Sequence, residues 1–184
     1  AAAKLHIPVA HVEAGLRSFN RRMPEEINRV LTDHVADRLF CPSETAVVNL
    51  AAEGLTAGVH LVGDVMHEAL MHAVTLAGKR SDVLGRMRLA GGGYALATIH
   101  RAENTDDPER LARLVAALQE VARDTPVVFP VHPRTRTKLP PSAHGAGLHL
   151  VEPLGYLDMV RLETQAAVIL TDSGGIQKEA YWLR

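Results

Sequence analysis

Carboxylates and guanidinium groups are concentrated in one short stretch near the start of the chain. Residues 11–29 contain three glutamates and four arginines. Residues 8–12 have the composition of a short buried strand, and Glu13 follows this strand directly. Its carboxylate is therefore expected at the carboxyl end of a sheet strand, where open α/β sheets bind their ligands. A carboxylate at such an edge can take up and return a proton during catalysis.

A second group of carboxylates follows at a predicted helix start. Pro24 is favourable at the first position of a helix, and Glu25 and Glu26 occupy the first turn, where negative charge is stabilised. We expect this helix start to face the same crevice as Glu13. The pattern alone is equally compatible with a purely structural strand, loop and capped helix, because acidic first turns favour helix starts in any protein.

The helix predicted over residues 25–37 has apolar residues at helical spacing, which indicates one apolar face. The residues on this face are Ile27, Val30, Leu31 and Val35. His34 lies on the same stripe and is expected to be a partly buried structural histidine rather than a ligand.

A glycine-rich turn near the end of the chain is a candidate phosphate site. A strand predicted over residues 166–171 leads into Asp172, and Ser173 is placed to cap a helix that begins with Gly174 and Gly175. Backbone N–H groups and the helix dipole at such a start favour a phosphate or diphosphate. Because the turn lacks both the Walker and the GxGxxG spacing, a nucleotide diphosphate fits it better than a triphosphate with magnesium. Glycine-rich strand-to-helix turns are also common without any ligand.

Two histidines follow predicted strands at the same sheet edge. His100 comes after residues 94–99 and His132 after residues 126–131, so both are candidates for acid, base or diphosphate contact. The other histidines lack metal-ligand spacing, and we predict no structural metal. Nucleophilic catalysis is not predicted either, because the chain has no Gly-x-Ser-x-Gly motif and Cys41 has no activating neighbours.

Strands alternate with helices along the whole chain, which predicts an α/β fold. Such alternation implies parallel sheets with right-handed crossovers and hence two doubly wound halves. The predicted domain boundary separates residues 1–63 from residues 64–184, and the loosest stretches lie at residues 78–81 and 91–93. The clearest helix is predicted over residues 108–122.

Composition limits the class of protein further. The 184 residues are 47% hydrophobic and 22% charged, as in soluble globular proteins, and the apolar runs are too short to span a bilayer. A net charge of −1 argues against nucleic-acid or membrane binding through bulk charge. The single cysteine excludes an intramolecular disulfide and suits a reducing cytoplasm. The helix ends expected near Ala1 and Arg184 lack start and stop signals, so we expect a fragment.

Several of these motifs occur in the order found in one known family. The motifs are His11–Ser18, Pro24–Arg29, Gly63-Asp64, Thr98–Asn104, Pro130–Pro133 and Asp172–Glu179. Together they resemble the successive motifs of non-hydrolysing UDP-N-acetylglucosamine 2-epimerases and cover nearly the whole chain. The resemblance implies a GT-B-like fold, with two doubly wound Rossmann-like domains, parallel sheets and the sugar nucleotide between them. Residues 1–63 would be the C-terminal part of the first domain, and residues 64–184 the N-terminal and central part of the second, nucleotide-binding domain.

The resemblance also implies a reaction and a set of site residues. Family members interconvert UDP-N-acetylglucosamine and UDP-N-acetylmannosamine by eliminating and re-adding UDP, as isomerases without a cofactor. The catalytic residues implied are Glu13, Glu25 and His100. The substrate-binding residues implied are Arg17, Arg29, His132, Ser173, Gly174, Gly175 and Glu179.

Arg29 is expected either to contact phosphate or to orient Glu25, and Glu26 is assigned only to the electrostatics of the helix start. The family's first strands, with a further catalytic aspartate, would precede Ala1, so we expect the chain alone to be weakly active or inactive. The parent protein is expected to be a homodimer.

Three other functions remain open at this point. One is a 2-epimerase of a modified UDP-sugar such as a diacetamido uronic acid. Another is a GT-B glycosyltransferase, which would share the diphosphate-binding helix but require an acceptor. The last is a UDP-sugar binding module without turnover.

Overall fold

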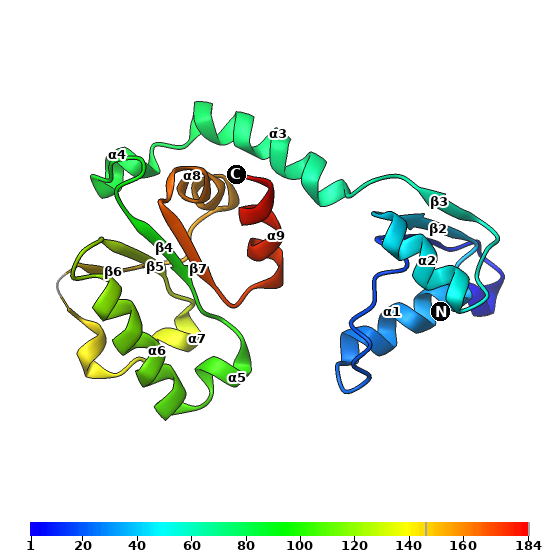
Figure 1. Ribbon diagram of the computed structural model, residues 1–184, viewed down its shortest axis with the longest axis horizontal. Helices are drawn as coiled ribbons and strands as arrows, with labels where there is room; N and C mark the ends of the chain where they lie inside the picture. The colour runs from blue at the N-terminus through cyan, green and yellow to red at the C-terminus, as the bar shows by residue number, and fades with distance from the viewer. Residues whose placement is uncertain (146, 184) are drawn as a thin grey trace. The chain divides into compact units, whose positions relative to one another are not determined.

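The computed structural model describes residues 1–145 and 147–183 and divides into two compact units, residues 1–69 and residues 70–184 (Figure 1). The division falls within helix α3 (Val65–Arg80), later than the boundary predicted after residue 63. Ala146, in the loop predicted over residues 140–147, and Arg184, at the end of the last predicted helix, lie outside the described residues.

The first unit contains a three-stranded parallel sheet in the order β1-β2-β3. After a 3-10 turn, η1 (Ala2–Leu5), its elements are β1 (Ala10–Val12), α1 (Pro24–Val35), β2 (Arg38–Cys41), α2 (Glu44–Ala52) and β3 (Val59–Leu61). The predicted alternation is therefore confirmed. The prediction that the first strand is buried is wrong, since Val12 is 49% exposed. Within the described residues, β1 is an edge strand and pairs with β2 alone.

The core of this unit lies between the sheet and α2. Leu39 and Cys41 of β2 are buried together with Ala46 and Leu50 of α2, so Cys41 is a core residue. Gly15 lies close to the same helix, because a Cβ atom added to it would lie 2.3 Å from the carbonyl oxygen of Ala46. The turn after β1 is therefore pressed against α2, and only glycine fits at position 15.

Helix α1 buries acidic side chains and exposes apolar ones. Glu26 and Asp33 are buried, whereas Ile27, Leu31 and Val35 are 46%, 61% and 53% exposed. The predicted apolar stripe is therefore largely exposed. The prediction that His34 on this stripe is partly buried is wrong, because His34 is exposed. The inward face of α1 carries carboxylates because they accept hydrogen bonds from the turn that follows β1.

The second unit contains a four-stranded parallel sheet in the order β6-β5-β4-β7. Its strands are β4 (Ala95–Thr98), β5 (Val127–Pro130), β6 (Leu148–Val151) and β7 (Val168–Thr171). After α3, its helices are α4 (Val83–Met87), α5 (Ala102–Thr105), α6 (Pro108–Val121), α7 (Pro133–Arg136), η2 (Pro141–Ala143), α8 (Tyr156–Gln165) and α9 (Gly174–Trp182). Within the described residues, every helix is too short or too polar to cross a bilayer.

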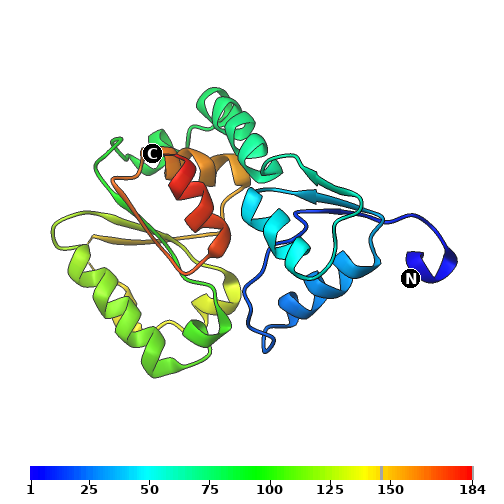
Figure 2. The ribbon, with the colours of Figure 1, turned by 45° about the vertical axis from the view of Figure 1, so that its right-hand side comes forward.

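Helices cover both faces of this sheet (Figure 2). On one face, Leu111 and Val115 of α6 pack against Ala95 and Ala97 of β4. On the other face, Leu162 of α8 packs in a separate cluster with β4 and β5. Burial on both faces is typical of parallel sheets, and it explains why the two inner strands, β4 and β5, consist largely of apolar residues.

Two details differ from the predicted helices of this unit. The stretch predicted to be loose at residues 78–81 lies largely within α3, which continues to Arg80. Burial of Ala73 and Ala77 stabilises this helix enough to offset the low helix propensity of Gly78. The short helices α4, α5 and α7 were not predicted, because each has too few residues to display a helical period.

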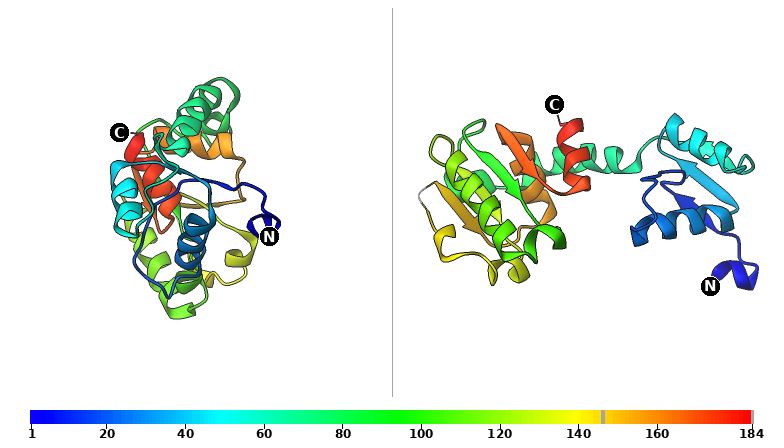
Figure 3. Two further views of the ribbon diagram at one scale, coloured as in Figure 1. Left: turned by 90° about the vertical axis from the view of Figure 1, so that its right-hand side faces the viewer. Right: turned by 60° about the horizontal axis from the view of Figure 1, so that its bottom comes forward.

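The strand order places a topological switch point between β4 and β7. From β4 the sheet grows through β5 to β6, and β7 then returns to the opposite side of β4. In open parallel sheets, ligands bind at the carboxyl ends of the strands at such a point. Figure 3 shows α9 in red directly after β7 in orange, so α9 begins at this edge.

Candidate active site

The turn after β1 holds Glu13 in an unusual backbone conformation. Its φ angle is +68°, in the left-handed region that residues other than glycine rarely adopt. The amide of Ala14 donates to the carbonyl of Phe40 at 3.0 Å, and the amide of Gly15 donates to Asp33 Oδ2 at 3.1 Å. Such strain persists only where the surroundings fix it, and these two bonds hold the backbone directly after Glu13.

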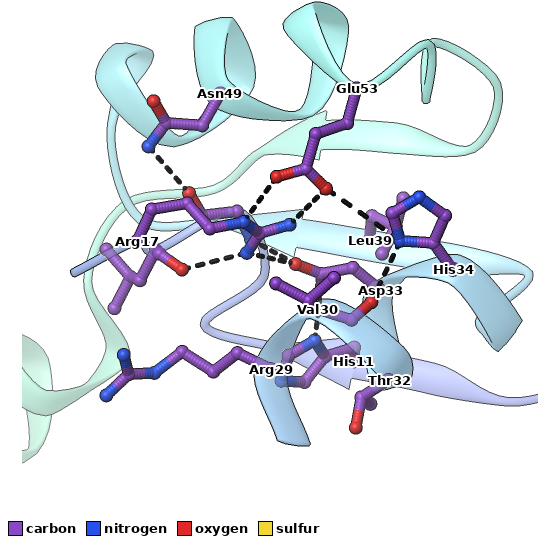
Figure 4. A network of polar contacts seen from close by, with 12 residues as sticks. His11, Arg17, Arg29, Val30, Thr32, Asp33, His34, Leu39, Asn49 and Glu53 are labelled. Atoms are coloured by element: carbon purple, nitrogen blue, oxygen red, sulfur yellow. Dashed lines mark hydrogen bonds and ion pairs between the residues drawn. The ribbon is translucent and has the colours of Figure 1, made fainter. Parts of the chain in front are cut away.

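Asp33 of α1 is the centre of a polar network in this unit (Figure 4). Its carboxylate is fully buried, and Oδ1 lies 2.5 Å from His11 Nδ1 while Oδ2 accepts from Arg17 Nη1 at 2.6 Å. The partners of Asp33 lie on both sides of Glu13 in the sequence, with His11 before it and Gly15 and Arg17 after it. The carboxylate of Asp33 therefore contacts the turn that carries Glu13 at both of its ends and holds it in place.

Arg17 is almost completely enclosed, with 1% of its side chain exposed. Nε and Nη2 donate to the two oxygens of Glu53 at 2.7 and 2.9 Å, and Nη1 also donates to the carbonyl of Leu16 at 2.8 Å (Figure 4). The hydrogen bond with Glu53 raises the pKa of Arg17 and lowers that of Glu53. With Asp33 included, four of the five N–H donors of Arg17 are used inside this unit. Its role in substrate binding stays a prediction.

Glu26 anchors the next part of the same loop. It is buried, and it accepts from the amides of Ser18 and Phe19, both at 2.9 Å, and from Arg29 Nη1 at 3.1 Å. Burial alone would raise the pKa of Glu26, but these hydrogen bonds hold it below its ordinary value. The assignment of Glu26 to helix-start electrostatics alone is therefore wrong. Arg29 pairs with Glu26 and not with Glu25, which is exposed in the first turn of α1.

In the second unit, Asp172 and His100 lie together at the switch point, after β7 and β4. Asp172 accepts from the amides of His100 and Arg101, each at 3.1 Å, and from Asn104 Nδ2 at 2.8 Å. Its Oδ1 also lies 3.0 Å from His100 Nδ1. Burial would raise the pKa of Asp172, but the bonds from Asn104, Arg101 and His100 lower it. The carboxylate is thus kept ionised beside the ring of His100.

The predicted cap at the start of α9 is confirmed. Ser173 Oγ accepts from the amide of Ile176 at 3.4 Å, and the amide of Ser173 donates to Thr171 Oγ1 at 2.9 Å. Gly174 and Gly175 supply the first helical N–H groups, which no carbonyl of the helix can pair. A Cβ atom added to Gly174 would meet no other described part of the chain within 4 Å, so there is open space beside Gly174.

Two further carboxylates lie on the helices around β7. Glu179 of α9 accepts from the Tyr156 hydroxyl at 3.2 Å, and burial raises its pKa. Glu163 of α8 is buried, and within the described residues its Oε2 has no hydrogen-bond partner. Burial, together with the charge of Glu179, raises the pKa of Glu163 to about 8.

His132 follows β5 at the same sheet edge as His100. It is exposed and caps the short helix α7, where its Nδ1 accepts from the amide of Arg134 at 3.3 Å. No group of three or more His, Cys, Asp or Glu side chains in the described part of the chain is arranged to hold a metal ion.

The structure adds residues to both units that the sequence did not indicate. Asp33 and Glu53 hold the turn of Glu13, and Tyr156 contacts Glu179 in the second unit. Asn104, which contacts Asp172, lay within the recognised motif Thr98–Asn104. Asp172 lay within a recognised motif, and its position directly after a strand was the one available signal. Asp33 had no such signal, because its partners are 16 to 22 residues away in the sequence.

Comparisons with known proteins agree with these features. A sequence profile of the family described as UDP-N-acetylglucosamine 2-epimerase matches residues 1–184. The chain is 50% identical to a UDP-N-acetylglucosamine 2-epimerase homolog of Methanococcus maripaludis, over 100% of this chain and 53% of that protein. It is 49% identical to the UDP-2,3-diacetamido-2,3-dideoxy-D-glucuronate 2-epimerase of Pseudomonas aeruginosa, over 99% of this chain and 51% of that protein.

A solved structure has the same arrangement of elements. The Methanocaldococcus jannaschii UDP-GlcNAc 2-epimerase in complex with UDP-GlcNAc and UDP matches with a TM-score of 0.84 and 43% identity, over 99% of this chain and 53% of that one. The predicted GT-B-like α/β fold with parallel sheets is thereby confirmed. The chain spans about half the length of the curated relatives it matches.

Proposed function

The chain belongs to the UDP-N-acetylglucosamine 2-epimerase family, and from this premise we propose that its protein interconverts UDP-N-acetylglucosamine and UDP-N-acetylmannosamine. The observation that carries the proposal is the cluster at the β4–β7 switch point, where His100 and Asp172 adjoin the capped, open start of α9. A sheet edge of this kind suits the diphosphate of a sugar nucleotide.

The reaction requires proton transfer on both faces of the sugar. A base removes the C2 proton while the C1–O bond to UDP breaks, which leaves a 2-acetamidoglucal and UDP. UDP then adds back at C1 while a proton is delivered to the opposite face of C2, so atoms and charge balance. We assign these two transfers to Glu13 and Glu25, each of which would contribute roughly 10² to 10⁴ in rate. The hydrogen-bonded turn around Glu13 supports this assignment, because it fixes the backbone that carries this carboxylate.

The second unit would hold UDP throughout the reaction. The departing diphosphate gains negative charge, and the amides at Gly174 and Gly175, with Ser173, would stabilise it at the positive end of α9. Glu179, partly buried and bonded to Tyr156, would accept from the ribose hydroxyls. His100 would contact the reacting end of the substrate, and His132 would contact phosphate.

The two arginines have less direct roles in this proposal. Arg17 would act by holding the turn of Glu13, since most of its donors are already used there. Arg29 would hold Glu26, and its 34% exposed side chain leaves donors for phosphate. The reaction neither oxidises nor reduces the sugar, so we propose it without a cofactor.

A second candidate substrate is favoured by one comparison. The 49% identity to the P. aeruginosa diacetamido-glucuronate epimerase points to a UDP-sugar with an acetamido group at C3 and a carboxylate at C6. The chemistry at C1 and C2 would be unchanged, because neither substituent takes part in the bonds that are made and broken at C1 and C2.

A chimera provides the test, because the chain matches half of its relatives. Residues 1–184 would replace the matching segment of the M. jannaschii epimerase, and the chimera would be incubated with UDP-GlcNAc in heavy water. We expect UDP-ManNAc to form with deuterium at C2, and NMR would measure this incorporation. A glycosyltransferase or a binding module would incorporate no deuterium. The diacetamido uronic acid nucleotide, tested alongside, decides between the two substrates. The 184-residue chain alone is expected to be weakly active or inactive.

The catalytic assignment is tested in the same chimera. Glu13→Gln and Glu25→Gln should each lower deuterium incorporation by roughly 10² to 10⁴. Glu120→Gln, at an exposed ion pair on α6, is the matched control and should retain the full rate. Normal incorporation in either Glu13→Gln or Glu25→Gln would remove that residue from the mechanism.

A further inference from the structure

One carboxylate, that of Asp172, contacts both the backbone and the ring of His100. The amide of His100 donates to Oδ1 and Oδ2 at 3.1 and 3.2 Å, and Oδ1 lies 3.0 Å from Nδ1 of the ring. A carboxylate bound to a residue's own amide can reach only the near nitrogen of its imidazole, which is Nδ1. Nε2 lies on the far side of the ring from Asp172.

The chemistry of the two groups fixes where the hydrogen lies. A neutral imidazole carries one hydrogen, on either nitrogen, and an ionised carboxylate can only accept. At 3.0 Å, a bare Nδ1 would direct its lone pair at Oδ1 and be repelled. The hydrogen is therefore favoured on Nδ1, which leaves the lone pair on Nε2. Bonds from Asn104 and Arg101 keep Asp172 ionised and in place.

We propose that Asp172 is a positioning residue that sets the tautomer of His100, so that Nε2 is the nitrogen that meets the substrate. This inference rests on the proposed function, in which His100 is a catalytic residue. The exposure of the two side chains agrees with it, since 56% of His100 but only 13% of Asp172 is accessible.

The inference names the atom through which His100 acts. With Nδ1 bonded to Asp172, neutral His100 presents an acceptor to the ligand at Nε2, and the ring becomes a donor there only after taking up a proton. An adjacent carboxylate uses the same logic in serine hydrolases, where it selects the tautomer without itself being protonated.

The test reads the tautomer directly, in the full 184-residue chain labelled with 15N-histidine. At a pH where the rings are neutral, we expect a protonated Nδ1 and an unprotonated Nε2 for His100, whose signal is assigned with His100→Gln. His72, exposed on α3, is the internal reference. A wild-type His100 that carries its hydrogen mainly on Nε2 would overturn the inference without any further variant.

Two variants separate tautomer control from simple support of the loop. Asp172→Asn should move the His100 tautomer ratio at least about tenfold toward Nε2–H, because the amide no longer offers two acceptor oxygens. Asn104→Ala removes another partner of the same carboxylate and should leave Nδ1 protonated. An unchanged ratio in folded Asp172→Asn would contradict the proposal. The tautomer is read without substrate, so absence of epimerase activity in the chimera would leave this result standing.

Discussion

Each unit of the chain has an aspartate that accepts a backbone amide of a turn and contacts a histidine, but the two aspartates have different surroundings. Asp33 is fully buried and faces the charged Arg17. Asp172 is slightly exposed and faces backbone amides and the neutral amide of Asn104. The histidine at Asp33 is 19% exposed, whereas the histidine at Asp172 is 56% exposed.

The different surroundings suit the two aspartates to different roles, because one holds a turn in place and the other orients the ring of a histidine. A buried carboxylate with a charged partner is costly to disturb, which suits Asp33 to fixing the strained turn of Glu13. A carboxylate with neutral donors beside an exposed imidazole suits Asp172 to presenting His100 to a ligand.

The other buried glutamates extend the comparison. In the first unit, Glu26 accepts from two amides and an arginine. In the second, Glu163 is equally enclosed, but within the described residues its Oε2 accepts from no donor. Burial thus lowers stability at Glu163 once the carboxyl ionises, whereas the hydrogen bonds of Glu26 offset its burial.

The largest effect is expected at the buried aspartate of the first unit. Asp33→Asn leaves Arg17 partly unpaired and removes an acceptor for His11 and Gly15, so it should lower the free energy of unfolding by about 3–5 kcal/mol. Urea unfolding of the chain would measure this, with exposed Glu44→Gln as the control. A loss below about 1 kcal/mol would mean that Asp33 does not hold the turn.

Glu163→Gln should change how stability depends on pH. The folded pKa of Glu163, about 8, lies above the ordinary value of 4.5, so the wild type loses stability as pH rises from 4.5 toward 8. The variant lacks this loss. Its free energy of unfolding, relative to that of the wild type, should therefore rise by on the order of 3 kcal/mol between pH 4.5 and 7. Thermal unfolding across this range measures it, and parallel curves for the two proteins would contradict the expectation.

Glu26→Gln should show a smaller effect with the opposite pH dependence. The folded pKa of Glu26 is lowered, so its stabilisation is present above pH 4.5 and is lost as pH falls through the folded pKa. At neutral pH the free energy of unfolding of the variant should be lower by about 1–2 kcal/mol. The glutamine has one side-chain oxygen, whereas the amides of Ser18 and Phe19 donate to two different oxygens of Glu26. Urea unfolding at pH 7 and pH 3.5 tests this, and an equal loss at both would show that its charge is irrelevant.

Features set by neighbouring residues could be predicted from the sequence. The cap at Ser173 depends on a side chain within three residues of the bonded amide, and the strand–helix alternation depends on local periodicity. The parallel sheets follow from that alternation.

Features set by distant residues could not be predicted. Periodicity identified the apolar stripe of α1, but it did not show that Leu31 on this stripe is 61% exposed. Asp33 and Arg17 are 16 residues apart in the sequence, and a loop and most of α1 lie between them, so no local pattern indicates their contact. The glycine turn at Ser173 was recognisable, whereas the contact between Asp172 and His100 required the pairing of β4 with β7.

The most direct test of this account is the rate of deuterium incorporation at C2 by the chimera carrying Asp172→Asn, measured beside its urea unfolding. If Asp172 presents His100 for catalysis, the rate should fall by roughly 10² or more, while stability changes by no more than about 1–2 kcal/mol. A folded Asp172→Asn chimera that incorporates deuterium at the wild-type rate would contradict the account.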